Sequence, residues 1–175
     1  MKKKDNISRT ERAVYRYKDT VYGLAVTQLR SKPNADDVFQ EVFMTYLEKA
    51  PDFESDEHEK AWLIRTTINI SRRYTVLPRW ISLENFSGEP ADISLETEQQ
   101  RRVFNEVQSL PEKYRLAIYL YYFEGMPAAE CARVLKISEE ALRKRLSRGR
   151  DILRKRLESD RYETDIQGNK GTAYP

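Results

Sequence analysis

The segment that most restricts the fold lies near the C-terminus, where a short apolar stretch, a break and a long basic stretch follow one another. Residues 128–135 carry small and apolar side chains at helical spacing, and residues 136–138 interrupt them. Ser138 is suited to cap a second helix, whose N-terminus the carboxylates of Glu139 and Glu140 would favour. Along one side of that helix the leucines recur at Leu142, Leu146, Leu153 and Leu157. The pattern predicts a helix-turn-helix, in which two helices meet at a steep angle around an apolar corner.

The second helix of this motif would carry its positive charge on the side away from the leucines. Residues 139–156 hold eight basic and three acidic side chains, a net charge of +5. A helix fits the major groove of DNA, where arginine can donate two hydrogen bonds to guanine while other basic side chains hold phosphates. The candidate DNA-binding residues are Arg143, Lys144, Arg145 and Arg148. The alternative is a basic amphipathic helix that only packs or binds an acidic partner.

Helical spacing continues through most of the chain, which has only six glycines in 175 residues. In the N-terminal half we predict helices over about 10–29, from an N-cap at Asn34 onward, and over about 60–74. In the C-terminal half, the nearly continuous apolar run from Tyr114 to Phe123 predicts a buried central helix. The predicted fold class is all-α, with two small helical domains joined by a flexible linker and the helix-turn-helix in the second. The predicted ranges are 10–76 and 94–158 for the domains, 77–93 for the linker and 159–175 for a disordered tail.

The N-terminal half contains a surface of the opposite charge. Residues 34–59 hold nine acidic side chains and one basic side chain, a net charge of −8. Asp37, Gln40 and Glu41 lie off the apolar stripe of the second predicted helix, and the third presents Arg65, Asn69, Arg72 and Arg73 on its polar side. Surfaces of opposite charge indicate different partners, although a solvated helix face would have the same composition.

Several classes of protein are disfavoured by what the sequence lacks. One cysteine, one histidine, no glycine-rich phosphate loop and no zinc spacing argue against an enzyme, a cofactor and a metal site. No apolar run approaches the roughly 20 residues of a membrane span, and no apolar stretch follows the basic N-terminus as in a secretory signal. We therefore expect a cytoplasmic protein without a small-molecule substrate. The paired carboxylates Asp36 and Asp37 keep an enzyme open as an alternative, but a place in a helix first turn would explain them.

Several segments resemble one family, the extracytoplasmic-function sigma factors. The C-terminal domain of that family is similar to Leu110-Pro-Glu-Lys-Tyr-Arg, Ala129-Glu-Cys-Ala-Arg-Val-Leu-Lys-Ile-Ser and Leu142-Arg-Lys-Arg-Leu-Ser-Arg-Gly-Arg. Its polymerase-binding helix resembles Ala35-Asp-Asp-Val-Phe-Gln-Glu-Val-Phe, and its minus-ten helix resembles Trp62-Leu-Ile-Arg-Thr-Thr-Ile-Asn. The resemblance covers about residues 10–158, and two motif sets in the family's order make it specific.

The resemblance implies a division of labour between the two halves. Asp37, Gln40 and Glu41 would dock on the clamp helices of the largest subunit of core RNA polymerase, and the flap of the second largest subunit is a further expected contact. The C-terminal domain would bind the minus-thirty-five element of promoter DNA. Phe53, Arg65, Asn69, Arg72 and Arg73 would take the minus-ten element as a single strand, with Phe53 as the wall of a base pocket. Factors of this kind are usually held by an anti-sigma protein, often membrane-anchored.

The sequence departs from the family at four positions. Lys136 occupies the turn position where the family usually has glycine, which predicts a slightly strained turn. Glu140 and Ala141 replace a small residue and a threonine, so the family's promoter sequences should not be transferred. Cys131 stands where isoleucine is usual, and we interpret it as a small buried hydrophobe rather than a redox sensor. The main alternative function is a helix-turn-helix regulator that acts on duplex DNA without polymerase.

Overall fold

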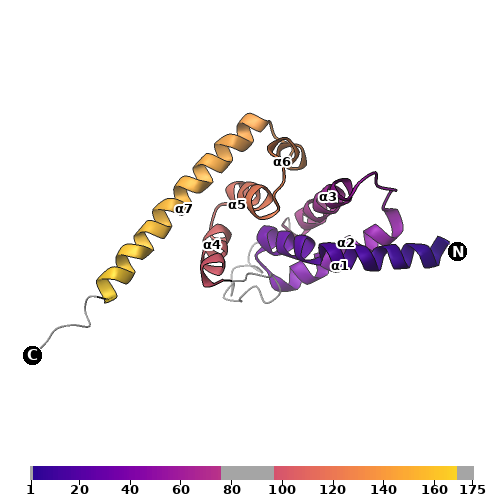
Figure 1. The fold of residues 1–175 in the computed structure, drawn as a ribbon, viewed down its shortest axis with the longest axis horizontal. Coiled ribbons are helices and arrows are strands. Elements are labelled where there is room, and N and C mark those ends of the chain that lie inside the picture. The colour runs from indigo at the N-terminus through magenta and orange to yellow at the C-terminus, as the bar shows by residue number, and fades with distance from the viewer. Residues whose placement is uncertain (1, 76–96, 169–175) are drawn as a thin grey trace, which may run out of the picture. The chain divides into compact units, whose positions relative to one another are not determined.

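The computed structural model describes residues 2–75 and 97–168, all of whose regular elements are helices. The chain divides into two compact units, Met1–Glu96 and Thr97–Pro175. The all-α prediction is thus confirmed (Figure 1). The predicted linker, 77–93, lies outside the described residues.

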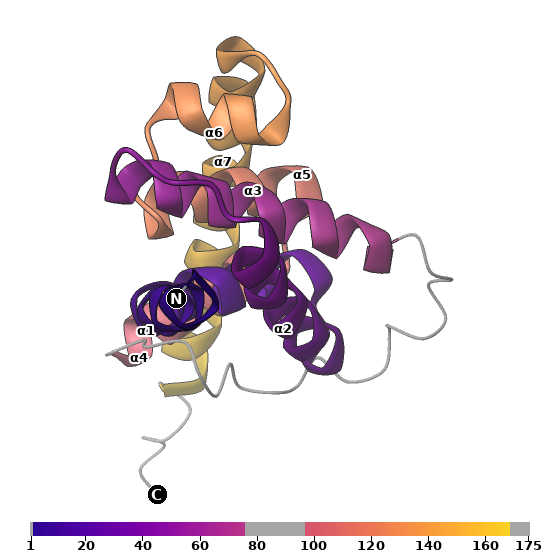
Figure 2. The same cartoon turned by 90° about the vertical axis from the view of Figure 1, so that its right-hand side faces the viewer.

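The N-terminal unit consists of three helices, α1 (Lys2–Leu29), α2 (Lys32–Lys49) and α3 (Asp56–Thr75), each of which contacts the other two. Figure 2, which views α1 end on, shows α2 and α3 next to it. The helices close around a cluster of buried side chains because their apolar positions recur at the helical period. This cluster includes Tyr17, Val21, Val38, Val42, Tyr46, Leu63 and Ile70, and Trp62 packs against it half-buried.

The start of α2 differs from the prediction. The helix begins at Lys32, its N-cap position is Ser31, and Asn34 lies inside the first turn. Pro33 fits there because the first helical amides have no intrahelical partner, so a residue without an N–H loses nothing. Asp36 and Asp37 consequently lie beyond the first turn, and Asp36 accepts a 3.0 Å hydrogen bond from the Tyr22 hydroxyl.

The C-terminal unit contains α4 (Glu98–Gln108), α5 (Glu112–Ile118), a π-helical turn η2 (Tyr119–Phe123), α6 (Ala128–Leu135) and α7 (Glu139–Gly168). A capping box opens α4: the Thr97 hydroxyl accepts a 3.1 Å bond from the Gln100 amide, and the Gln100 side chain accepts a 3.2 Å bond from the Thr97 amide. Among the fully buried side chains are Phe104, Val107, Leu120 and Leu142.

The predicted helix from Tyr114 to Phe123 is buried only in its first part. Residues 115–120 are buried, but Tyr121, Tyr122 and Phe123 are exposed. The π-helical turn η2 begins at Tyr119, and within it the rings of Tyr119 and Phe123 stack with centroids 5.5 Å apart. The inserted residue of a π-turn changes the direction of the following side chains, so the apolar run does not remain on one buried face.

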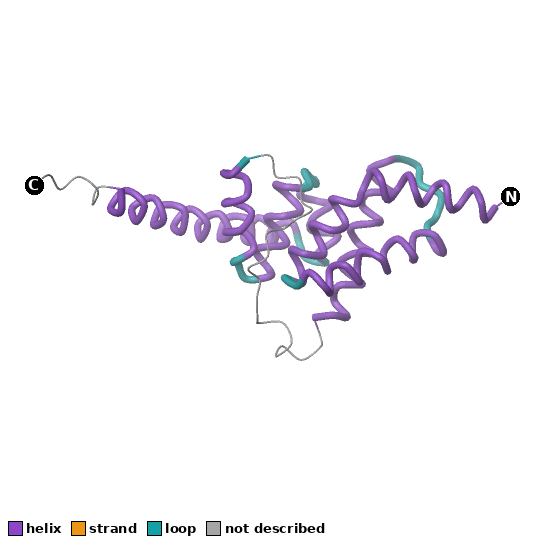
Figure 3. The backbone as a smooth tube through the Cα atoms, turned by 90° about the horizontal axis from the view of Figure 1, so that it is seen from below, coloured by secondary structure: helices purple, strands orange, loops and turns teal. Residues whose placement is uncertain are grey.

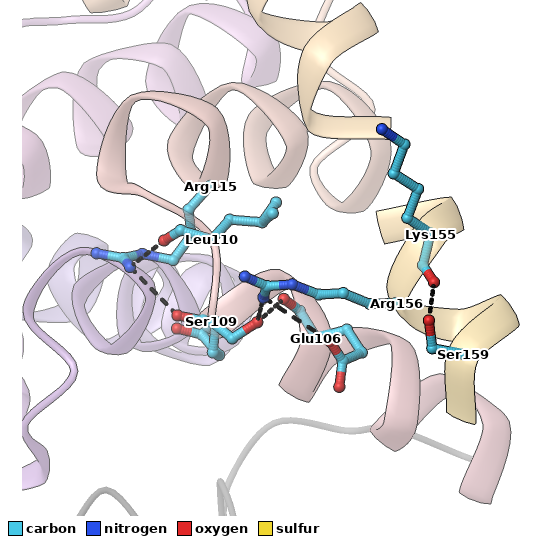
Figure 4. Close-up of polar contacts among 8 residues, drawn as sticks. Glu106, Ser109, Leu110, Arg115, Lys155, Arg156 and Ser159 are labelled. Carbon is cyan, nitrogen blue, oxygen red and sulfur yellow. Dashed lines mark hydrogen bonds and ion pairs between the residues drawn. The ribbon is translucent and has the colours of Figure 1, made fainter. Parts of the chain in front are cut away.

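A buried arginine links the end of α4 to α5. The Arg115 guanidinium donates hydrogen bonds to the carbonyl oxygens of Gln108 at 3.2 Å and Leu110 at 2.8 Å (Figure 4). These bonds satisfy backbone acceptors that the end of α4 leaves without helical partners. Nearby, Arg156 of α7 contacts the Ser109 hydroxyl and lies 3.9 Å from Glu106, which joins α7 to the same corner.

Helix α7 is longer than predicted. It continues from Glu139 to Gly168, so residues 159–168 are helical where the sequence analysis expected disorder. These residues contain no proline, and their first glycine is Gly168, so nothing in them breaks a helix that is already formed. In Figure 3 the last turns of α7 extend past the other helices of this unit.

Candidate nucleic-acid interface

Helices α6 and α7 and the turn between them form the predicted helix-turn-helix. The Ser138 hydroxyl accepts a 3.1 Å hydrogen bond from the Ala141 amide, which confirms Ser138 as the N-cap of α7. Leu135, Leu142 and Leu146 are buried, as the predicted apolar corner requires. The corner therefore holds α7 at a defined angle and leaves the opposite side of its first turns free.

The turn between α6 and α7 contains the strained residue that the sequence predicts, Lys136. Lys136 has a φ of 56° and a ψ of 47°, in the left-handed region that favours glycine. The Ile137 amide reaches back to the Ala132 carbonyl oxygen at 3.0 Å, a bond that depends on this backbone conformation.

Replacing Lys136 with glycine should relieve this strain. A side chain in the left-handed region costs about 1 kcal/mol, which glycine avoids at the expense of greater freedom in the unfolded chain. We expect Lys136→Gly to raise the free energy of unfolding of the C-terminal unit by about 0.5–1 kcal/mol, measured by denaturant titration. Lys136→Ala, which keeps a Cβ, is the control and should leave stability nearly unchanged. Equal stability of both variants would contradict the assignment of strain.

The basic residues of α7 divide into exposed and half-buried members. Arg143, Lys144 and Arg148 are exposed as predicted, whereas Arg145 is half-buried. Arg143 lies 3.2 Å from Glu139 and Lys144 lies 2.7 Å from Glu140, so both cations have an acidic neighbour one turn earlier. A hydrogen bond with Arg148 lowers the pKa of Tyr114 in α5. The start of α7 thus presents paired donors and acceptors instead of a uniformly cationic surface.

In the N-terminal unit, the predicted polymerase-binding residues share one face of α2. Asp37 and Gln40 are exposed, and Glu41 is half-buried and ion-paired with Arg73 of α3. Met44 lies one turn further along the same face and is 55% exposed. Met44 is not among the residues predicted for this face, because that prediction rested on polar side chains alone. Its exposure beside carboxylates is typical of a protein-binding surface.

The predicted minus-ten residues of α3 are also exposed together. Arg65, Asn69 and Arg72 recur at intervals of four and three residues, so they lie along one side of the helix. The Arg65 Nε donates to the Ala61 carbonyl oxygen at 3.3 Å, a contact within its own helix. Arg73 is exposed too, but its pair with Glu41 draws it toward α2.

Phe53 lies in the loop between α2 and α3, inside a cluster of three rings. Its ring stacks on Tyr46 with centroids 6.1 Å apart, and it meets the edge of Trp62 at 5.9 Å. Phe53 is half-buried and also lines a groove of about 950 Å³ between α1 and this loop. One side of the ring is thus fixed by the core, and another borders open space.

Two family models match the chain in the order of its two units. The model described as Sigma-70 region 2 matches residues 13–75, which lie within the three helices of the N-terminal unit. The model described as Sigma-70, region 4 matches residues 100–153, which include the helix-turn-helix. Together the two models cover more than half of the 175 residues.

Curated relatives agree with these models over most of the chain. The chain is 27% identical to the extracytoplasmic-function (ECF) RNA polymerase sigma factor SigW of Bacillus subtilis over 158 residues, which are 81% of this chain and 84% of that protein. The chain is an extracytoplasmic-function sigma factor of the sigma-70 family. The probable RNA polymerase sigma factor RfaY of Xanthomonas campestris is also 27% identical, over 90% of this sigma factor, which spans 42% of the length of RfaY.

Solved structures share the fold of this sigma factor. CnrH, determined in complex with the cytosolic domain of CnrY, has a TM-score of 0.64 at 24% identity, over 91% of this chain and 94% of that one. RpoE of Bartonella quintana, determined with the anti-sigma factor NepR, has a TM-score of 0.67 at 22% identity, over 86% of this chain and 97% of that one. Within its described residues, no helix of this sigma factor is long and apolar enough to cross a membrane, and no acidic, cysteine or histidine side chains gather as metal ligands.

Cys131 of this sigma factor is a buried thiol in α6. It is 0% exposed, its Sγ lies 3.4 Å from the Met126 carbonyl oxygen, and burial raises its pKa to about 11. Since the thiolate is the reactive form, we expect alkylation by iodoacetamide to be at least about a hundredfold slower in the folded protein than in denaturant. Mass spectrometry of labelled samples would measure this, and similar rates in both states would favour the redox-sensor alternative.

Proposed function

We propose that this sigma factor binds core RNA polymerase, recognises the minus-thirty-five and minus-ten promoter elements and promotes promoter opening. The observation that carries the proposal is the presence of two different surfaces in one chain. One is the capped basic helix α7, and the other is the pair of exposed polar faces on α2 and α3. A regulator of duplex DNA needs only the first surface.

The minus-thirty-five element would be bound by the first turns of α7. The exposed Arg143, Lys144 and Arg148 can reach base edges or phosphates when α7 enters the major groove. Arg145, being half-buried, is better placed to hold a phosphate near the protein surface.

Core polymerase would be bound through the α2 face. Asp37, Gln40 and Glu41 offer carboxylate and amide groups to a basic partner surface. The resemblance to the family implies that this surface is the clamp helices of the largest polymerase subunit. The exposed Met44 adds apolar contact area beside them. The flap of the second largest subunit would contact the C-terminal unit.

The minus-ten element would be bound as a single strand by the loop and α3. Opening a duplex costs base stacking, which an aromatic ring in the protein can replace. Phe53 borders open space and can offer such a ring. Asn69 can pair with a base edge, and Arg65, Arg72 and Arg73 can hold the backbone once Arg73 leaves Glu41.

We further propose that the factor acts in the cytoplasm as an initiation factor rather than as an enzyme, under the control of an anti-sigma protein that can be membrane-anchored. In support, CnrH and RpoE, whose fold it shares, were both determined with a protein partner. Affinity purification from unstressed native cells should recover such a partner. Recovery of the factor with polymerase alone would count against this control.

Reconstitution with core polymerase tests the main proposal. The holoenzyme should start transcripts at discrete genomic sites that core polymerase alone does not use, as mapped by sequencing transcript 5′ ends. Asp37→Arg should abolish this by repelling the basic partner, whereas Glu158→Arg, a charge reversal at an exposed position of α7, should not. Specific duplex binding without any effect of polymerase would instead support the duplex-DNA regulator.

A further inference from the structure

An arginine of α1 holds the start of the loop between α2 and α3. Arg9 of α1 donates a hydrogen bond to the Pro51 carbonyl oxygen, and its guanidinium lies 3.5 Å from the Asp52 carboxylate. Figure 3 shows this loop passing beside the N-terminal half of α1. Because the Asp52 side chain is fully exposed, its ion pair contributes little. The bond to the Pro51 carbonyl ties the main chain of the loop to α1.

The same guanidinium also covers the aromatic cluster. Its central carbon lies 5.4 Å from the centre of the Tyr46 ring and 5.2 Å from the centre of the Phe53 ring. Both distances are within the range of cation–π attraction. Tyr46 is itself fixed, because its hydroxyl donates to Glu59 at the start of α3 and burial raises its pKa to about 12, so it stays protonated. Arg9 thus holds the Phe53 ring of the loop against the Tyr46 ring of the core.

A second tether secures the far end of the loop. Arg16 lies 2.5 Å from the Asp56 carboxylate, and the Tyr17 hydroxyl donates to the Asp56 carbonyl oxygen at 3.2 Å. The acidic residues of this segment are difficult to reconcile with nearby DNA on sequence grounds alone. The structure accounts for Asp52 and Asp56 as partners of arginines on α1.

The groove between α1 and the loop has a lining that suits a base better than a phosphate. Five carboxylate side chains and three arginines line it, together with Phe53. A phosphate would be repelled by this excess of negative charge, whereas an unpaired base is neutral and can stack on a ring. Its volume of about 950 Å³ leaves room for a nucleobase beside Phe53.

We propose that Arg9 is a positioning residue, which holds Phe53 at the edge of this groove so that an unpaired base of the minus-ten strand can stack there. The inference rests on the proposed promoter-opening function. It adds a residue of α1 to those that support binding of the minus-ten strand. Arginine suits this role because its planar guanidinium can lie on two rings while its N–H groups point to a carbonyl oxygen. A lysine ammonium group has the same charge but is not planar, so it cannot lie flat on two rings.

The test uses the full chain in holoenzyme with two DNA probes. Both carry the promoter that the wild-type holoenzyme uses most in the genomic experiment. One is a fork, duplex at the minus-thirty-five element and single-stranded at the minus-ten element, and the other is the minus-thirty-five duplex alone. Arg9→Ala should weaken fork binding about tenfold and leave duplex binding within about twofold. Arg9→Lys should resemble Arg9→Ala.

Arg12→Ala is the matched control, because Arg12 lines the same groove from the next turn of α1. It should bind the fork within about twofold of wild type. Equal losses for Arg9→Ala and Arg12→Ala would show that groove charge alone matters and would overturn the proposal. Three other results would also overturn it. Arg9→Ala could bind the fork as tightly as wild type, or lose as much affinity for the duplex as for the fork. Arg9→Lys could bind the fork as tightly as wild type.

A DNA-free measurement separates this inference from the proposed function. In a Trp80→Phe background Trp62 is the remaining tryptophan, and its ring lies 5.9 Å from that of Phe53. Arg9→Ala should shift Trp62 emission to longer wavelength as the loop moves away, and Arg12→Ala should not. If wild-type holoenzyme does not bind the fork but Arg9→Ala shifts Trp62 emission, the proposed promoter function is wrong and the contact of Arg9 with the loop is supported. Without the shift, the role of Arg9 in holding the loop is itself wrong.

Discussion

Replacing Leu142 with alanine is expected to lower the free energy of unfolding of the C-terminal unit by about 2–5 kcal/mol. Leu142 is 0% exposed and lies in the second turn of α7, at the apolar corner with α6. Removing its side chain loses buried apolar area and leaves a cavity that two helices joined by a tight turn cannot close. The unfolding of this unit should be followed as the loss of helical signal in far-ultraviolet circular dichroism that occurs without a change in tryptophan fluorescence, because both tryptophans, Trp62 and Trp80, lie outside it.

Leu157→Ala provides the matched control for this prediction. Leu157 lies on the same helix and belongs to the same leucine series, but it is half-buried. Its truncation should therefore cost clearly less than that of Leu142, since less apolar area is removed from water on folding. Equal losses would mean that the helix-turn-helix corner is not the stabilising centre of the unit.

The helix-turn-helix could be predicted from sequence because its determinants are local. The cap at Ser138, the strained turn at Lys136 and the buried Leu142 all follow from residue type and spacing within a few turns of helix. The same reasoning placed Arg143 on the exposed side. It misplaced the N-cap of α2, because Asn34 has a high capping preference and the tolerance of Pro33 inside the first turn was the weaker signal.

Contacts that depend on how one helix packs against another could not be predicted from the sequence. The Arg115 side chain completes the end of α4, and its role depends on the angle between two helices. Gly149 is similar: a Cβ there would lie 3.0 Å from Ile118, so its hydrogen allows α5 and α7 to approach closely. The contact of Arg9 with Phe53 links residues far apart in sequence. None of these is visible in helical periodicity, which reports only which face of a helix is buried.

Arg143→Ala is expected to reduce the preference of the sigma factor for its own minus-thirty-five element by about 5- to 150-fold, which corresponds to about 1–3 kcal/mol. Arg143 lies in the second turn of α7, and its side chain is 70% exposed. It can turn from Glu139 to a guanine edge, because an exposed ion pair of this kind contributes little and is easily given up. Binding to the promoter duplex and to a scrambled duplex should be compared at several salt concentrations.

The salt dependence decides which kind of contact Arg143 makes. If it reads a base, the loss falls on the promoter duplex and binding to the scrambled duplex changes little. If it only touches a phosphate, both duplexes lose affinity equally and the salt slope falls by about one. Arg154→Ala is the control, since Arg154 is an exposed arginine about three turns further along the same side of α7 and pairs with Asp151 at 3.5 Å. If Arg154→Ala reduced the preference for the promoter duplex as much as Arg143→Ala, sequence recognition could not be assigned to the first turns of α7.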